Sequence, residues 1–239
     1  MRRRVRDSLA ENLRLTGPWQ RHDLLHVAPQ AWDLALAAHP LQAATPLLAG
    51  WTVRAWPVIV RRRMPCDDPN RVPIGVPLPP AAAKLRIALT VPIEAVIKRS
   101  ASVSLKNAAC AAPAVWKPTV SRLVALRAEH GVEPVAFGSL LWQHQTGLKY
   151  LSSQSDLDVL WPVSRGCAIF SLLSGITKIE EASPVCIDGE IVFPDGRAVN
   201  WRELYNAMRQ DAPAQVFVKS IDRVALAGVD QLISGGVAV

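Results

Sequence analysis

Two polar pairs, each attached to a short apolar run, constrain the fold of this chain most strongly. Gly138-Ser139 follows the apolar residues 134–137, and Asp156-Leu157-Asp158 opens a second apolar run that ends at Trp161. Short apolar runs of this kind are typical of buried strands. Residues 140–145 have the composition of a helical turn. The sequence therefore predicts a strand, a helix and another strand, with polar groups at the junctions.

The first pair suits a phosphate ligand. Gly138 has no Cβ, so the backbone there can come close to a ligand. We expect Ser139 to cap the start of the helix and to donate a hydrogen bond to a phosphate oxygen. The N–H groups at a helix N-terminus also favour an anion.

The second pair suits a metal ion. Side chains alternate along a strand, so Asp156 and Asp158 are expected to share a face. Two adjacent carboxylates repel each other unless a cation lies between them. Mg²⁺ prefers carboxylate oxygens and bridges to substrate phosphates. The two pairs together predict an enzyme that transfers a phosphate-linked group from a triphosphate donor with Mg²⁺ as cofactor.

A third metal carboxylate is expected in the apolar run 184–193. If this run is one bulged strand, Asp188 is well placed to join Asp156 and Asp158. Asp188-Gly189 is equally typical of a tight hairpin turn, and Glu190 is then the competing carboxylate.

Length and composition limit the class of protein. The chain has 239 residues, of which half are hydrophobic, so it can bury a large core. No apolar run reaches the roughly 18 residues of a membrane span, and no apolar signal-peptide core follows the basic N-terminus. We therefore expect a cytoplasmic protein without membrane association. The four cysteines form no C-x-x-C pair, which argues against zinc and favours free, buried thiols.

Charge divides the chain into two predicted domains. Residues 1–120 contain 17 Lys and Arg against 7 Asp and Glu, a net charge of +10, whereas residues 121–239 contain 10 against 13, a net charge of −3. The prolines also cluster before residue 120. We predict a basic, strand- and loop-rich substrate- or partner-binding domain over residues 1–115 and a catalytic domain over residues 116–239. A basic surface attracts polyanions.

Several basic residues are candidates for phosphate binding. Residues 56–63 and 84–91 are predicted strands, and the prolines between them predict a loop-rich connection. Lys84 and Arg86 are then expected on one face. Arginine binds phosphate well through its planar fork. The predicted anion clamp consists of Arg61, Arg62, Arg63, Lys84 and Arg86. Lys219, at the end of the predicted strand 216–220, is a further candidate for phosphate binding.

The remaining expected elements surround the polar pairs. Helices are predicted over residues 118–130 and 168–176, a helix start near residues 199–205, and a last strand over residues 216–220.

Several segments, taken in order, resemble those of one enzyme family. They are Arg21-His22-Asp23, Val60-Arg61-Arg62, residues 75–80, Phe137-Gly138-Ser139, Trp142-Gln143, residues 146–151, residues 155–158, Asp188-Gly189-Glu190 and Trp201-Arg202-Glu203. This set is similar to the phosphoribosyl-dephospho-CoA transferases of malonate decarboxylase, also called its holo-acyl-carrier-protein synthases. The segment 146–151 also accounts for the long spacer of 16 residues between Ser139 and Asp156.

The resemblance implies an α+β fold in which a small strand- and loop-rich domain precedes a nucleotidyltransferase-like, polymerase-β-like mixed sheet with flanking helices. It implies Asp156 and Asp158 as essential carboxylates. The implied donor is 2′-(5″-triphosphoribosyl)-3′-dephospho-CoA, and the implied acceptor is a serine of the acyl-carrier subunit of malonate decarboxylase. Pyrophosphate is the implied second product.

Other interpretations stay open at this point. A citrate-lyase-type carrier, a small molecule or RNA could be the acceptor of the same chemistry. A basic module that binds nucleic acid is least favoured, because its support is the basic half and the four tryptophans Trp19, Trp32, Trp51 and Trp56, a residue type that more often lies in a core.

Overall fold

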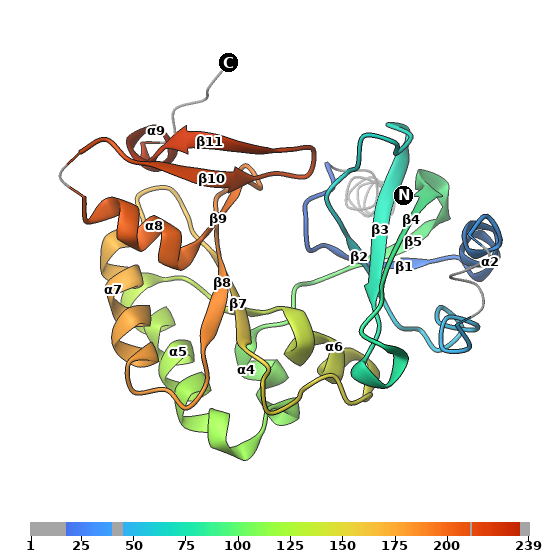
Figure 1. The fold of residues 1–239 in the computed structure, drawn as a ribbon, viewed down its shortest axis with the longest axis horizontal. Coiled ribbons are helices and arrows are strands. Elements are labelled where there is room, and N and C mark those ends of the chain that lie inside the picture. Colours follow the sequence, from blue (N-terminus) through green and yellow to red (C-terminus); the bar gives the residue numbers. More distant parts are fainter. Residues whose placement is uncertain (1–17, 40–44, 211, 235–239) are drawn as a thin grey trace, which may run out of the picture. The chain divides into compact units, whose positions relative to one another are not determined.

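The structure of the protein is a computed structural model that describes residues 18–39, 45–210 and 212–234. The chain divides into two compact units between Ser102 and Val103, and each unit is described by itself. Figure 1 shows both units and the labels of their elements.

The division differs from the boundary expected at residue 115. Leu105 N donates to Pro134 O at 2.8 Å, and Ala136 N donates to Val103 O at 2.9 Å. Ser104 also forms a bridge with Val135. These backbone hydrogen bonds join residues 103–105 to the second unit. The boundary expected at residue 115 is based on charge and proline content, which carry no information about this pairing.

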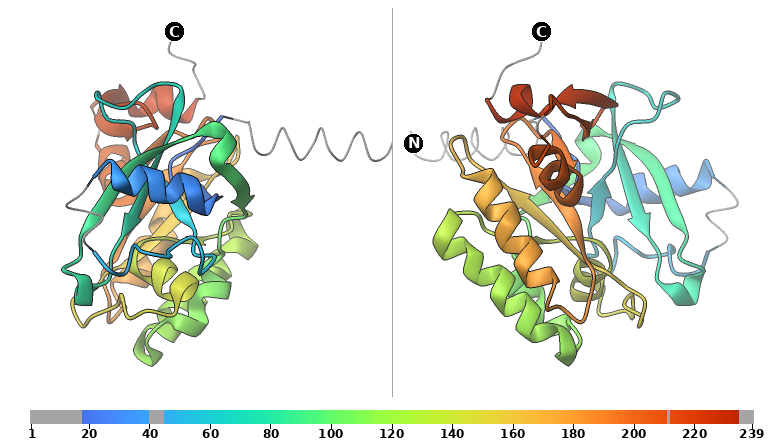
Figure 2. Two further views of the ribbon diagram at one scale, coloured as in Figure 1. Left: turned by 90° about the vertical axis from the view of Figure 1, so that its right-hand side faces the viewer. Right: turned by 60° about the vertical axis from the view of Figure 1, so that its left-hand side comes forward.

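The first unit contains an antiparallel sheet with the strand order β4-β3-β2-β1-β5. Helix α2 contacts β4 and lies across the sheet (Figure 2). Trp32 and Trp51 are fully buried, and their indole N–H groups donate to Leu48 O and Pro57 O, so both tryptophans belong to the core. The elements are β1 Leu24–Val27, α2 Pro29–Ala37, β2 Val58–Val60, β3 Arg71–Pro77, β4 Arg86–Pro92 and β5 Val96–Ser100, with short 3₁₀ turns at Pro80–Ala82 and Ile93–Ala95.

Three local expectations for this unit are wrong. The proline-rich connection contains β3, which pairs with β4 along its whole length. Strand β2 ends at Val60, so the three arginines follow the strand. Lys84 lies in a tight turn with φ 52°, outside β4, because its N–H and that of Ala83 bond back to Pro79 O and Pro80 O. Lys84 and Arg86 therefore do not share a strand face.

The second unit contains a mixed sheet with the strand order β11-β10-β9-β8-β7-β6. Strands β7 and β8 are parallel, and the other pairs are antiparallel. The strands are β6 Val135–Ala136, β7 Leu157–Pro162, β8 Ile187–Val192, β9 Ala198–Asn200, β10 Gln215–Lys219 and β11 Val224–Gly228. The helices are α4 Leu105–Ala108, α5 Lys117–His130, α6 Gly138–Thr146, α7 Ile169–Glu180, α8 Trp201–Met208 and α9 Val229–Ile233, with 3₁₀ turns at Ala109–Ala111 and Ala114–Trp116.

The two faces of this sheet differ in burial. On one face, β7 and β8 present Leu157, Val159, Trp161, Ile187 and Ile191, all with no exposed surface. Figures 1 and 2 show α5 and α7 side by side on one side of these strands. Alternation and register place the polar residues Asp158, Asp188, Glu190, Asn200 and Lys219 on the opposite face, together with the exposed Phe217 and Leu226.

The expected fold class is confirmed: the protein is α+β, with a mixed sheet and flanking helices of the nucleotidyltransferase-like kind. The helices predicted after Ser139, over residues 118–130 and near residue 168 correspond to α6, α5 and α7. The expectation of a last strand at residues 216–220 is wrong, because β11 follows β10 in a hairpin. Asp188-Gly189 forms no turn: β8 continues through it, and its register with β7 has no shift.

All four cysteines are free, as expected, but Cys66, Cys110 and Cys186 are exposed, so the prediction of buried thiols is wrong for these three. Among the described residues, no helix has the length and apolar character needed to cross a membrane.

Candidate active site

Asp158 and Asp188 lie directly opposite each other on two parallel strands. They are register partners in the β7–β8 pair, so their side chains leave the same face of the sheet. Neighbouring strands lie about 4.8 Å apart. Asp158 is half-buried and Asp188 is exposed. Asp156 is exposed and lies one residue before the start of β7, so it is not part of the strand that was expected to carry it.

Gly138 lies against the carboxylate of Asp158. The glycine has φ 57°, in the left-handed region, and a Cβ built at this position would overlap Oδ2, Cγ and Cβ of Asp158. The main chain is fixed at the same place, because Phe137 N donates to Asp158 O at 3.1 Å. The glycine therefore brings the start of α6 next to the carboxylate.

Ser139 does not cap α6, contrary to expectation. Phe137 occupies the N-cap position with extended backbone, and no side chain caps the helix there. The first N–H groups of a helix have no acceptor within the helix. The start of α6, beside Asp158, is thus oriented to favour an anion. Phosphate binding by Gly138 and Ser139 stays a prediction.

The spacer between α6 and β7 is held against the helix. Gln143 Oε1 accepts hydrogen bonds from Tyr150 N and Leu151 N, both at 3.1 Å, and its amide Nε2 donates to Ala111 O at 2.8 Å. The long spacer therefore does not separate the two motifs in space.

The two candidates for a third carboxylate have different surroundings. Glu190 is 7% exposed, and its Oε1 accepts a hydrogen bond from Lys219 Nζ at 2.8 Å in an ion pair. Asp188 is exposed, and the two hydrogen bonds described for its carboxylate, from Gly189 N at 2.7 Å and Asn200 Nδ2 at 2.9 Å, both end on Oδ1. This arrangement favours Asp188, beside Asp158, over Glu190.

The donor set suits Mg²⁺ bound together with a substrate. Within the described parts of the chain, no three His, Cys, Asp or Glu side chains are already gathered as a metal site. Mg²⁺ in phosphoryl-transfer enzymes is usually held by one or two carboxylates, water and substrate phosphates rather than by a complete protein cage. The facing pair of Asp158 and Asp188 fits such a role, and Asp156 as a further ligand stays a prediction.

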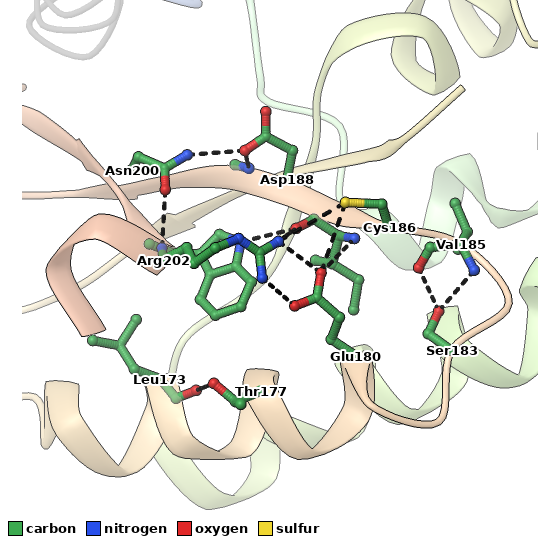
Figure 3. A network of polar contacts seen from close by, with 12 residues as sticks. Leu173, Thr177, Glu180, Ser183, Val185, Cys186, Asp188, Asn200 and Arg202 are labelled. Atoms are coloured by element: carbon green, nitrogen blue, oxygen red, sulfur yellow. Dashed lines mark hydrogen bonds and ion pairs between the residues drawn. The ribbon is translucent and has the colours of Figure 1, made fainter. Parts of the chain in front are cut away.

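A polar network that includes Glu180, Asn200 and Arg202 adjoins Asp188 (Figure 3). The sequence patterns did not identify these three residues as candidates for a site. Arg202 forms an ion pair with Glu180, whose Oε1 also accepts from Ile187 N at 3.0 Å. The hydrogen bond from Arg202 holds the pKa of Glu180 below its usual value, although burial opposes this shift. Asn200 could have been recognised from sequence as a helix cap before Trp201, whereas Glu180 carries no local signal.

The residues of the predicted anion clamp differ in exposure: Arg61 and Arg63 are half-buried and the others are exposed. The Arg61 guanidinium bonds both carboxylate oxygens of Asp67, at 2.7 and 2.8 Å, and also the carbonyls of Ile74 and Leu89. Arg63 donates to Asp68 O and Arg71 O. Arg62, Lys84 and Arg86 are exposed. Anion binding by these residues stays a prediction, and Arg61 already has an internal role.

Comparisons with known proteins cover both units. The family model described as phosphoribosyl-dephospho-CoA transferase MdcG N-terminal domain matches residues 20–101, and the corresponding C-terminal domain matches residues 103–230. The two matches meet at the division between the structural units. No solved structure gives a significant match.

Curated relatives carry the same name. A phosphoribosyl-dephospho-CoA transferase of Bradyrhizobium diazoefficiens is 41% identical over 218 residues, which cover 91% of this chain and 94% of the relative. Proteins of that name from Xanthomonas axonopodis pv. citri and Xanthomonas campestris pv. campestris are 36% and 34% identical, over 84% and 77% of this chain and 90% and 84% of their own lengths. The chain belongs to the phosphoribosyl-dephospho-CoA transferase MdcG family, as its motifs indicate.

Proposed function

We propose that this protein transfers the phosphoribosyl-dephospho-CoA group from 2′-(5″-triphosphoribosyl)-3′-dephospho-CoA to a serine of the acyl-carrier subunit of malonate decarboxylase. The serine oxygen forms a bond to the α-phosphorus, the bond from that phosphorus to the bridging oxygen breaks, and pyrophosphate leaves. The serine proton passes to a base or to water. The reaction is of the nucleotidyltransferase class.

One observation carries this proposal: Asp158 lies against the start of α6 and opposite Asp188 on the neighbouring strand, in a chain whose two units both match the family. Phosphoryl transfer depends mainly on positioning and on neutralising charge. Two carboxylates would position Mg²⁺, and the bound Mg²⁺ together with the start of α6 would neutralise phosphate charge.

Each residue has a distinct part in the proposed reaction. Asp158 and Asp188, with Asp156, hold Mg²⁺, which when bound neutralises phosphate charge. The backbone at Gly138 and the Ser139 hydroxyl orient the leaving pyrophosphate at the start of α6. The exposed Arg62, Lys84 and Arg86 contribute positive charge for the anionic donor or for an acidic carrier.

Intact-mass spectrometry of the carrier subunit tests the proposal. The full-length protein is incubated with the carrier, Mg²⁺ and the triphosphoribosyl donor. A mass gain equal to the donor minus pyrophosphate supports the proposal, and a carrier whose acceptor serine is replaced by alanine is the control. No gain with folded protein and intact donor contradicts it.

Parallel reactions distinguish the malonate decarboxylase carrier from the other possible acceptors. A citrate-lyase-type carrier is incubated under the same conditions, and labelled ATP is offered with small molecules or RNA. Faster modification of the citrate-lyase carrier, or nucleotidylation without carrier modification, would replace the acceptor named here.

A further inference from the structure

We propose that the start of α8 is a positioning element for Asp188, with Asn200 as the positioning residue. The inference rests on the metal site of the proposed function. Asn200 is the N-cap of α8 and also contacts the Asp188 carboxylate (Figure 3). It therefore connects a helix end to a candidate metal ligand.

The cap fixes the orientation of the Asn200 amide. Its Oδ1 accepts from Arg202 N at 3.0 Å and from Glu203 N at 3.2 Å. An amide oxygen cannot donate, so these two donors identify the oxygen and direct Nδ2 toward Asp188. Nδ2 donates to Asp188 Oδ1 at 2.9 Å.

Trp201 and Arg202, the first two residues of α8, hold the backbone of the residue before Asp188. Strand β8 pairs with β9 over Glu190–Val192, so Ile187 lies outside this pairing. Ile187 O instead accepts from Trp201 Nε1 and Arg202 Nη2, both at 3.1 Å, and Ile187 N donates to Glu180 Oε1. Side chains thus satisfy the peptide groups that a strand partner would otherwise satisfy.

Three consecutive residues, Asn200, Trp201 and Arg202, therefore hold either Asp188 or the residue before it. Both hydrogen bonds to the Asp188 carboxylate use Oδ1, and Figure 3 shows the other oxygen directed away from Asn200. This geometry presents Oδ2 to a cation while Oδ1 is held. Groups that orient a metal ligand in this way typically change metal affinity about 10- to 100-fold when removed.

The test is Mn²⁺ binding to the full-length protein in the presence of the triphosphoribosyl donor, measured from the free Mn²⁺ signal in electron paramagnetic resonance and compared with the donor alone. Asn200→Ser keeps a good N-cap side chain but removes the amide that donates to Asp188. We expect its Mn²⁺ dissociation constant to rise about 10-fold or more, with a thermal midpoint close to that of the wild type. Asp188→Asn should raise the constant at least as much.

Ser104→Ala is the matched control, because Ser104 caps α4 in the same unit. It should lower the thermal midpoint and leave Mn²⁺ binding unchanged. Wild-type affinity in Asn200→Ser, or no Mn²⁺ binding by the wild type, would overturn the inference. A wild type that binds Mn²⁺ in an Asn200-dependent way but does not modify the carrier would contradict the proposed function and retain this inference.

Discussion

Gly138 and Asp158 are in such close contact that a side chain at position 138 would force the Asp158 carboxylate to move. A Cβ there would overlap the Asp158 carboxylate, and the glycine also has φ 57°. The two motifs that stand far apart in the sequence are therefore joined through a position without a side chain. This contact sets where the Asp158 carboxylate lies relative to the start of α6.

Gly138→Ala is expected to lower transfer by about 100-fold or more, since displacement of a reacting group by about 1 Å can have an effect of this size. Gly147→Ala is a matched control at the other end of α6, because Gly147 has φ 72° and open space where a Cβ would lie. Backbone strain should cost each variant about 1–2 kcal/mol of stability, and Gly138→Ala should lose more, because its Cβ also overlaps Asp158. Equal transfer rates for the two variants would contradict a role for the Gly138–Asp158 contact.

Asp158→Asn should abolish transfer and leave the fold intact. The side chain keeps its size but loses the charge that the proposed Mg²⁺ site requires, and the repulsion from Asp188 across the strand pair is relieved. Asp156→Asn is expected to do the same if Asp156 is also a ligand. Circular dichroism and carrier mass spectrometry check this prediction, and an unfolded variant would indicate a structural role.

Arg61 and Arg62 should behave differently although they are neighbours. Arg61→Ala leaves Asp67, whose side chain is 5% exposed, without its bidentate partner, and should destabilise the first unit by about 2–3 kcal/mol. Arg62→Ala, at an exposed position, should change stability by less than about 0.5 kcal/mol. If Arg62 binds the donor, its replacement should raise the KM for the donor. Urea unfolding and steady-state kinetics separate the two effects.

Lys219 is expected to stabilise the fold mainly through its ion pair with Glu190. Lys219→Ala leaves a carboxylate that is 7% exposed without its ion-pair partner, and should cost about 2 kcal/mol. Adding Glu190→Gln should restore most of this loss, since the remaining side chain is then neutral. A Lys219→Ala variant with normal stability but no transfer would instead indicate that Lys219 binds phosphate.

The Glu180–Arg202 pair should make stability depend on acidity. The pKa of Glu180 is lowered in the folded protein, chiefly by the hydrogen bond from Arg202. The contribution of Glu180 to the free energy of unfolding is therefore fully present above the pKa of an unfolded glutamate, about 4.3. It is lost as the pH falls through the lower pKa of Glu180 in the folded protein. Glu180→Gln should show a smaller loss of stability between about pH 5 and pH 3. Glu181→Gln, at the exposed neighbouring position, is the control and should keep the wild-type slope.

The sequence by itself determined the short-range features of this protein. The apolar runs next to Gly138 and Asp158 define β6, β7 and α6, and the family motifs identify the enzyme family from the residues alone. These features depend on neighbours in the chain, so their local patterns carry the information. The α+β class follows from the same patterns.

Only the tertiary structure decided which distant residues meet. The register of β7 with β8 places Asp188 opposite Asp158, while Glu190 is paired with Lys219 from β10. Arg61 bonds Asp67 and two carbonyls, although its sequence pattern suggests phosphate binding equally well. Asn200 reaches Asp188 because α8 begins where β9 ends. Strand register and side-chain pairing arise from contacts between residues far apart in the chain, which no local pattern records.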